Sequence, residues 1–328
     1  MDGSVKRASF QNVFDSIQDD LEAVECRLQE IGRSSNPLIA EVNRYLFQKK
    51  GKRLRPALLI LGSRLCGYRG QDHVFWSALV EIIHTASLIH DDIVDNSPLR
   101  RGRDTVHAKW GPNITVLLGD FLYIQSIALA LKTKNHAIID ILADVTAQMV
   151  EGELIEYSQS GNTGLGEDQY WEILDKKTAR LFSASCQIGG ILAGVPSGDQ
   201  DRLKEYGRNL GLSFQVIDDL LDFRGDEATL GKPVLSDLRE GRITLPLIYA
   251  LRRSNGDLRG ELVRLIKESG SAPGEILDRV AATGALDEAF EQAAACSQKA
   301  KDILAAFPES RPRDSLALMA DLVLYRKN

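Results

Sequence analysis

Two clusters of aspartates lie far apart in the sequence, each inside an apolar stretch with helical spacing. Their members are Asp91, Asp92 and Asp95 in HDDIVD, and Asp218, Asp219 and Asp222 in QVIDDLLD. At about 100° per residue, carboxylates four positions apart share one face of a helix and repel each other unless a cation lies between them. Carboxylate oxygens without Cys or His partners select Mg²⁺ or Mn²⁺, and Mg²⁺ prefers to share its shell with water and phosphate oxygens. The two clusters therefore predict a diphosphate held between two helices by Mg²⁺, although one cluster alone would more often be a solvated helix end.

Basic residues accompany both clusters, as a diphosphate site requires. They are Arg100 and Arg101 after the first cluster, Lys232 after the second, and Lys52, Arg53 and Arg55 in a separate GKRLRP segment. Guanidinium and ammonium groups pair with phosphate oxygens through charge-assisted hydrogen bonds. GKRLRP also fits an ordinary helix start with Pro56 in the first turn, so local pattern alone leaves both interpretations open.

The elements that must position these residues are predicted to be helices almost everywhere, because apolar residues recur at helical spacing and no sustained period-two alternation is present. The expected helices cover residues 8–32, 37–49, 54–67, 71–96, 113–133, 135–158, 167–194, 199–223, 242–254, 257–268, 274–282, 284–306 and 313–325. The breaks are short and polar except for residues 224–241, a charged stretch longer than a helix bundle needs. We therefore expect an all-α protein with one large helical domain spanning residues 1–328.

Composition excludes several other classes of protein. The 328 residues carry a formal net charge of −6, which gives no general attraction to nucleic acid. The N-terminus has no apolar signal segment, and the longest uncharged run, residues 181–198, is broken by Ser, Gln, Gly and Pro, so we expect no membrane span. The spacing of the four cysteines supports neither a zinc site nor a disulfide framework, and free thiols in the cytoplasm are expected at Cys26, Cys66, Cys186 and Cys296.

The chain resembles the trans-polyprenyl diphosphate synthases, which extend allylic diphosphates with isopentenyl diphosphate. GKRLRP, HDDIVD with its RRG continuation, GDFLY, KTA, FQVIDDLLD, GKP and SDLREGRITLPL occur in the family's order over nearly the whole length. The resemblance implies an isoprenoid-synthase bundle around a central apolar cavity, a homodimer, and a head-to-tail condensation. In that reaction the allylic diphosphate ionises, the isopentenyl double bond attacks the cation, and a proton is lost.

The resemblance also assigns roles to individual residues. It implies three Mg²⁺ ions, replaceable by Mn²⁺, with Asp91, Asp95 and Asp218 as ligands and with Asp222, Asp92 and Asp219 in supporting or water-mediated roles. The isopentenyl diphosphate site is expected at Lys52, Arg55, His84 and Arg101, with Arg53 nearby. The allylic diphosphate and the developing cation are expected to meet Arg100, Lys177, Thr178, Gln215 and Lys232.

Product length in this family depends on how far an apolar tunnel extends along the helix that carries the first cluster. Counting back from Asp91, small and aliphatic residues such as Ala86 precede the first aromatic residues, Trp76 and Phe75, which lie about 22 Å away at ~1.5 Å per residue. We therefore expect a medium- to long-chain product of about six to eight isoprene units, with the end of the tunnel near Met149.

Three alternatives to a medium- or long-chain synthase remain at this point. The first is a short-chain synthase that makes farnesyl or geranylgeranyl diphosphate, and the second is a class I terpene cyclase. The third is a non-catalytic subunit of a heteromeric synthase, which would not need two complete aspartate clusters.

Arg242 stands where the family commonly has Lys, so we keep it only as an auxiliary phosphate contact. The resemblance also implies that the C-terminal Arg326 and Lys327 close over the site, as basic tails do in some relatives.

Overall fold

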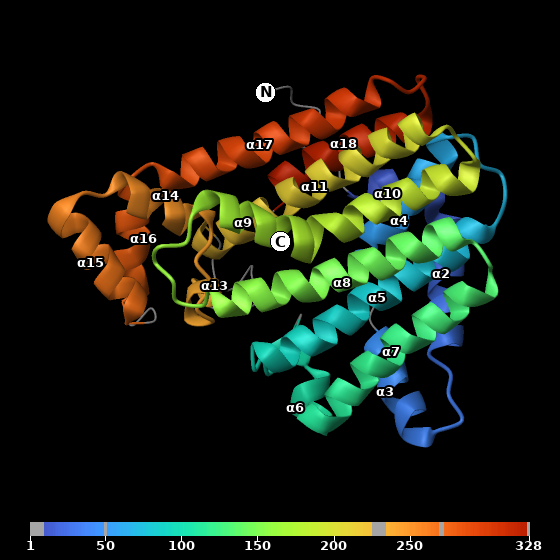
Figure 1. Cartoon of the computed structure of the whole chain (residues 1–328), viewed down its shortest axis with the longest axis horizontal. Helices are drawn as coiled ribbons and strands as arrows, with labels where there is room; N and C mark the ends of the chain where they lie inside the picture. The colour runs from blue at the N-terminus through green and yellow to red at the C-terminus, as the bar shows by residue number, and fades with distance from the viewer. Residues whose placement is uncertain (1–9, 49–50, 101, 225–233, 269–271, 327–328) are drawn as a thin grey trace. The chain divides into compact units, whose positions relative to one another are not determined.

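The computed structural model describes residues 10–48, 51–100, 102–224, 234–268 and 272–326 (Figure 1). In the first part of the chain the elements are α1 (Phe10–Phe14), the 3-10 turn η2 (Asp15–Ile17), α2 (Gln18–Ile31), α3 (Pro37–Phe47), α4 (Leu54–Leu65), α5 (Asp72–Val94), β1 (Leu99–Arg100), β2 (Arg103–Asp104), α6 (Val106–Trp110) and α7 (Pro112–Lys132). They continue with α8 (His136–Ser158), α9 (Glu167–Leu174), the π-helical turn η3 (Asp175–Ala179), α10 (Arg180–Ala193), α11 (Ser197–Arg224), α13 (Ser236–Arg239), α14 (Leu245–Arg253), α15 (Gly256–Lys267), α16 (Pro273–Ala282), α17 (Ala285–Leu304) and α18 (Arg311–Tyr325). The predicted all-α class is confirmed.

Contacts divide the chain into two compact units, each assembled from several segments. Unit 1 consists of Met1–Ala147, Leu181–Gly207 and Ile303–Met319, and unit 2 of Gln148–Arg180, Arg208–Asp302 and Ala320–Asn328. The first aspartate cluster and GKRLRP belong to unit 1, whereas the second cluster and KTA belong to unit 2. Each unit therefore carries some of the predicted site residues, and the single domain over residues 1–328 stays a prediction.

Unit 1 is organised around α5, which is apolar on nearly all sides and packs against α2, α4 and α7. Figure 1 shows α5 and α7 side by side. They approach closely at Gly119, where an added Cβ would lie 2.1 Å from Nε2 of His90. A helix buried on most faces leaves few positions for polar groups, so the end of α5 is where its aspartates can reach solvent.

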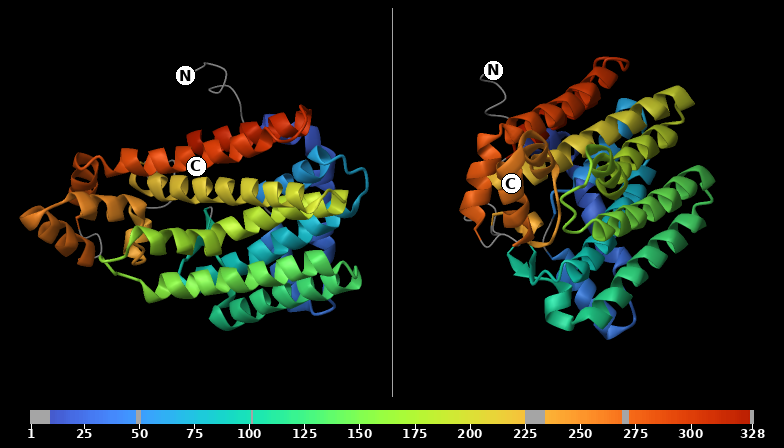
Figure 2. Two further views of the ribbon diagram at one scale, coloured as in Figure 1. Left: turned by 45° about the horizontal axis from the view of Figure 1, so that its top comes forward. Right: turned by 60° about the vertical axis from the view of Figure 1, so that its left-hand side comes forward.

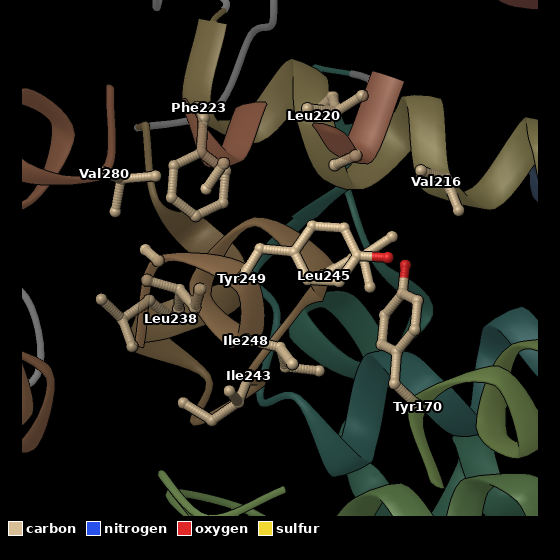
Figure 3. Close-up of a cluster of buried hydrophobic side chains, with 14 of the residues drawn as sticks. Tyr170, Val216, Leu220, Phe223, Leu238, Ile243, Leu245, Ile248, Tyr249 and Val280 are labelled. Carbon is tan, nitrogen blue, oxygen red and sulfur yellow. The ribbon is translucent and has the colours of Figure 1, made fainter. Parts of the chain in front are cut away.

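The core of unit 2 is formed by α9, the residues of α11 that follow position 207, the short helices α14 to α16 and the first half of α17. Figure 3 shows Val216, Leu220 and Phe223 of α11 together with apolar residues of α14, and the hydroxyl groups of Tyr170 and Tyr249 facing one another. Figure 2 shows α14 to α16, in orange, packed together from two further directions. Because one side of α11 packs on this core, polar residues such as Asp218 occupy its other side.

Helix α7 exposes a row of large apolar side chains. Leu117, Ile124 and Leu131 follow each other at seven-residue intervals and are 68%, 67% and 54% exposed. Among the described residues α7 is also the one helix whose length and hydropathy would allow it to cross a membrane, with 33% of the apolar window buried.

The structure adds short elements that the sequence did not reveal. The predicted helix over residues 167–194 contains the π-helical turn η3, and the stretch after the first cluster forms the β1–β2 hairpin and α6. Of the long charged stretch 224–241, residues 234–241 are described and include α13. Such short elements depend on contacts and capping rather than on a periodic pattern.

Candidate functional site

The first aspartate cluster lies at the C-terminal end of α5. Asp91 and Asp95 are partly exposed, and the chain turns there through backbone hydrogen bonds from Asp95 to Asp91 and from Ser97 to Asp92. The last turn of a helix carries a partial negative charge from its carbonyl groups. A cation bound at such a helix end would stabilise the two carboxylates further.

Asp92 faces the protein rather than solvent. Its carboxylate is 4% exposed and accepts a hydrogen bond from Nε of Arg100 at 2.6 Å, across the start of the β1–β2 hairpin. Burial raises the pKa of the Asp92 carboxyl, while the Arg100 charge acts in the opposite direction. The pair orients Arg100 and holds the hairpin next to the exposed aspartates.

A pocket of about 140 Å³ opens beside α5 in unit 1. Its polar lining includes Arg53, Glu81 and Asp92 and the predicted substrate residues His84 and Arg100. The structure therefore brings together, within one unit, residues that were predicted to hold the two diphosphates. A pocket with basic groups and His84 beside an acidic helix end can accept an anion that carries its own metal ions.

The GKRLRP segment starts α4 and presents its basic residues in different directions. Lys52 is exposed, and the guanidinium of Arg55 lies 4.6 Å from the centre of the Phe182 ring. Arg53, by contrast, is buried and bonds to two carboxylates, those of Glu25 and Glu81. Arg53 was predicted to contribute directly to substrate binding, but its guanidinium already has two carboxylate partners inside the protein.

The second cluster lies on α11 in unit 2, and its members are in different environments. Asp218 is 52% exposed and pairs with the C-terminal Arg326, whose Nη2 lies 2.9 Å from its Oδ1. Burial lowers the pKa of Arg326, with Asp218 acting in the opposite direction, and the guanidinium also stacks on Phe214. The Asp218 carboxylate pairs with Arg326 on one side, and the half of it that is exposed remains accessible to a metal ion.

Asp222 is buried and works as a helix cap. It is 1% exposed, and its carboxylate accepts hydrogen bonds from the Ser236 amide and hydroxyl and from the Asp237 amide, at the start of α13. These contacts give Asp222 a structural role that the predicted metal site did not include. Its place among the metal-site residues stays a prediction.

A chain of hydrogen bonds connects α9, η3 and α11 inside unit 2. The Tyr170 hydroxyl donates to Asp219 at 2.6 Å, the Gln215 amide donates to the same carboxylate at 3.0 Å, and the Thr178 hydroxyl donates to Gln215 Oε1 at 2.9 Å. Burial raises the pKa of Asp219 well above its usual range, and the nearby Asp237 adds to the effect. These hydrogen bonds fix the amide of Gln215 so that its oxygen faces Thr178. They therefore connect two residues that were predicted to act on the same substrate.

Lys177 lies in the π-helical turn η3 and carries two acidic partners. Its Nζ is 2.8 Å from Glu153 and 2.5 Å from Glu156, both on α8. A π-helical turn inserts one residue into a helix and often marks a functional site, because it changes the direction of the side chains around it. Here it places Lys177 and Thr178 on neighbouring faces of one turn, while Asp175 anchors the turn to Arg208 of α11.

Two predicted site residues, Arg101 and Lys232, lie outside the described residues. The same is true of Lys327. Arg242 is described, and its guanidinium pairs with Asp237 and Glu240.

Comparison with known proteins identifies the family. The family model described as polyprenyl synthetase matches residues 36–283. The chain belongs to the polyprenyl synthetase family. It is 36% identical to the octaprenyl diphosphate synthase of Haemophilus influenzae over 94% of both chains, and 32% identical to heptaprenyl diphosphate synthase component 2 of Bacillus subtilis over 98% of this chain and 92% of the relative.

Solved structures of polyprenyl synthases share the fold. The polyprenyl synthase of Caulobacter crescentus, solved with calcium and isoprenyl diphosphate, has a TM-score of 0.92 at 36% identity and covers 98% of both chains. A decaprenyl diphosphate synthase of Rhodobacter capsulatus has the same TM-score and identity and covers 98% of this chain and 100% of that one. The predicted family, the isoprenoid-synthase fold and the activity class of a trans-prenyltransferase are confirmed. Among the product lengths considered, the matches support a medium to long chain.

The donor set of this polyprenyl synthetase family member suits Mg²⁺. Among the described residues, no group of three or more His, Cys, Asp or Glu side chains is arranged as a complete metal shell. The partly exposed carboxylates of Asp91 and Asp95 and the exposed carboxylate of Asp218 instead supply separate oxygen donors. Mg²⁺ typically takes one or two carboxylates and completes its shell with water and substrate phosphates. The residues therefore fit Mg²⁺ that arrives with a diphosphate.

Several residues that shape the site were not found from the sequence. They are Glu25, Glu81, Glu153, Glu156 and Tyr170. Glu81 had a usable signal, since it is the single charged residue in the apolar run ALVEIIH. A lone acid in such a run needs a buried partner, but the sequence does not say that this partner is Arg53.

Proposed function

We propose that this polyprenyl synthetase family member condenses isopentenyl diphosphate with an allylic diphosphate, head to tail and in the trans configuration. The product is a medium- to long-chain polyprenyl diphosphate. The proposal rests above all on one observation: a chain matched by the family model over residues 36–283 carries acidic residues at both motifs. The first motif has the partly exposed Asp91 and Asp95 and the second has the exposed Asp218, and each motif pairs with an arginine.

In the proposed reaction, the residues of unit 1 bind isopentenyl diphosphate and part of the allylic diphosphate. Lys52, Arg55 and His84 hold the isopentenyl diphosphate, with Arg101 as a further contact, and Arg100 reaches the allylic diphosphate. Arg100 is oriented for this by Asp92. Charge-assisted hydrogen bonds from several directions fix both substrates and bring the double bond near the reacting carbon.

The residues of unit 2 act on the leaving diphosphate and on the allylic cation. Lys177 and Lys232 pair with the diphosphate, and the oxygens of Thr178 and Gln215 face the developing positive charge. The hydrogen bonds that Gln215 donates to Asp219 and that Thr178 donates to Gln215 hold these dipoles in place before the reaction, so that little reorganisation is needed. The proton released after condensation passes to the departing diphosphate.

Metal ions complete the proposed site. Asp91, Asp95 and Asp218 would hold three Mg²⁺ ions, replaceable by Mn²⁺, with Asp222 in a supporting role. When bound, these ions withdraw charge from the breaking carbon–oxygen bond as Lewis acids. The chain's own contribution is to place exposed carboxylates at two separate helix positions.

We propose an octaprenyl- or heptaprenyl-sized product, and a homodimer that works in the cytoplasm. The named relatives include octaprenyl and heptaprenyl synthases, and Ala86 on α5 is small and buried, which supports a tunnel along this helix. The exposed apolar face of α7 supports a partner subunit, because contiguous exposed apolar residues are typical of interfaces. All four cysteines are free thiols, which suits a reducing compartment.

Incubation of the purified chain with Mg²⁺, farnesyl diphosphate and labelled isopentenyl diphosphate tests the proposed function. We expect label in a prenol of about six to eight isoprene units after dephosphorylation and chromatography. A cyclase would release an unlabelled hydrocarbon, a short-chain synthase would stop at 15 or 20 carbons, and a non-catalytic subunit would incorporate no label. Each of these results would contradict the proposal.

Asp91→Asn and Asp218→Asn test the metal site directly. Both changes keep the side-chain shape but remove a charge that Mg²⁺ requires, so we expect turnover to fall at least about 100-fold. Excess chelator should abolish turnover of the unmodified protein. Asp144→Asn is the matched control, because it removes the same charge from an exposed residue of α8 that belongs to neither cluster. Retained turnover in Asp91→Asn or Asp218→Asn would remove that residue from the metal site.

A further inference from the structure

The buried guanidinium of Arg53 connects three separate segments of unit 1. Its Nε and Nη2 donate to the two oxygens of Glu25 on α2, at 2.6 and 3.0 Å, and its Nη1 donates to Glu81 on α5, at 2.6 Å. All three residues are buried, each with less than a tenth of its surface exposed. A forked contact of this kind fixes the plane and the position of the guanidinium far better than a single hydrogen bond would.

The backbone of Arg53 is held in an unfavourable conformation by these contacts. Its φ is 51° and its ψ is 34°, in the left-handed region, directly before α4 begins at Leu54. A non-glycine residue there costs free energy and persists only where the surrounding contacts require it. This left-handed residue changes the direction of the chain between Lys52 and Arg55. The Lys52 side chain is exposed, whereas that of Arg55 lies against Phe182.

The contact with Glu81 connects this turn to the pocket. Glu81 lies one helical turn before His84 on α5, and both line the pocket together with Gly51, Arg53 and Arg100. The Arg53–Glu81 bond therefore sets the position of residues 51–55 relative to His84.

We propose that Arg53 is a positioning residue that holds Lys52 and Arg55 in place for isopentenyl diphosphate by clamping their turn to Glu25 and Glu81. This inference rests on the proposed function and assigns Arg53 an indirect role in place of the predicted substrate contact. Lys52 and Arg55 then depend on Arg53 for their geometry, while the allylic diphosphate does not.

Substitutions on both sides of the clamp test the proposal. Arg53→Gln, Glu81→Gln and Glu25→Gln each break one part, and we expect KM for isopentenyl diphosphate to rise about tenfold in each, with KM for the allylic substrate within about twofold. Arg53→Lys keeps the charge but loses the fork, and we expect it to recover part of the effect.

The sign of the Glu81→Gln effect separates positioning from simple charge. This substitution removes a negative charge from a pocket that binds an anion, so a purely electrostatic effect would lower KM for isopentenyl diphosphate. Positioning predicts a higher KM. If Arg53 contacts the substrate directly, the Arg53 variants alone raise KM while Glu25→Gln and Glu81→Gln leave it unchanged, and this result would overturn the proposal.

Arg64→Gln is the matched control. Arg64 also joins α4 to α2, through Asp20, but it lies at the opposite end of α4 from Lys52 and Arg55. We expect this variant to lower the unfolding temperature and to leave both KM values unchanged. An equal rise in KM for isopentenyl diphosphate in Arg64→Gln would show that general loosening, not the clamp, is responsible.

Amide hydrogen exchange of residues 51–57, which include the Ala57 amide that donates to the Arg53 carbonyl oxygen, provides a readout that does not require turnover. Exchange should become at least about tenfold faster in Arg53→Gln and Glu81→Gln and stay unchanged in Arg64→Gln. Unchanged exchange in the clamp variants would overturn the proposal even if activity fell. An unmodified protein that incorporates no isopentenyl diphosphate would instead contradict the proposed function, while the exchange rates would still decide whether Arg53 fixes this turn.

Discussion

Some side chains of this protein are predicted to face substrate, and others hold those side chains in place. Tyr170 belongs to the second kind, because its hydroxyl is buried and donates to Asp219, which in turn receives the amide of Gln215. Burial raises the pKa of Tyr170 well above its usual range, and the Asp219 carboxylate adds to this. The hydroxyl therefore stays protonated and remains a donor.

Tyr170→Phe removes one donor and leaves a buried carboxylate with one partner fewer. We expect the free energy of unfolding to fall by about 1–3 kcal/mol and kcat to fall several-fold, because Gln215 loses part of its support. Urea unfolding and steady-state kinetics measure the two effects. Tyr157→Phe removes the same hydroxyl from a residue that is 69% exposed and should change stability by less than about 0.5 kcal/mol. Equal effects in the two variants would contradict the supporting role of Tyr170.

The sequence predicted the residue types of the site better than their surroundings. The aspartate spacing and the basic residues of GKRLRP are local patterns, and spacing along a helix is enough to find them. The partners of Arg53, by contrast, are 28 positions away on either side, and the groups capped by Asp222 begin 14 positions later. Such pairings depend on tertiary packing, which a single sequence does not encode in any local pattern.

At the scale of whole helices, close packing in unit 1 depends on positions without a side chain. Gly189 of α10 faces α4, where an added Cβ would lie 2.6 Å from the Ser63 amide nitrogen and 2.8 Å from the Leu59 carbonyl oxygen. Both are backbone atoms, so the contact can be relieved only by moving one helix away from the other. The long helices were predicted from periodicity, but this approach distance was not, because it depends on which faces meet.

Gly189→Ala should therefore separate α4 from α10. We expect a loss of about 1–3 kcal/mol in the free energy of unfolding, since the strain falls on the backbone. Gly198→Ala is the matched control, because an added Cβ there meets nothing within 4 Å and alanine favours the helix. Its stability should stay the same or rise, as measured by thermal unfolding. A Gly189→Ala variant as stable as the unmodified protein would show that the two helices are not in close contact.

At the scale of the whole molecule, the apolar face of α7 stands out because its large side chains are not covered by the rest of the single chain. Leu117, Ile124 and Leu131 repeat every seven residues, which places them along one side of the helix. Exposing three large aliphatic side chains in a row costs free energy that burial against a second copy would recover, at about 25 cal/mol per Å² of apolar surface. The proposed homodimer is the simplest arrangement that covers this face.

Leu117→Glu combined with Ile124→Glu places two charges on this face and should convert the dimer to a monomer. A carboxylate without a partner at an apolar interface is strongly unfavourable, so the effect falls on association, while exposed positions leave folding of the single chain intact. Size-exclusion chromatography with light scattering measures the mass, and circular dichroism checks the helix content. Leu258→Glu changes a leucine on α15 that is 62% exposed and should remain dimeric. A monomeric unmodified protein at micromolar concentration, or a doubly substituted protein that still forms dimers, would contradict an interface through α7 and would require another partner for its apolar side chains.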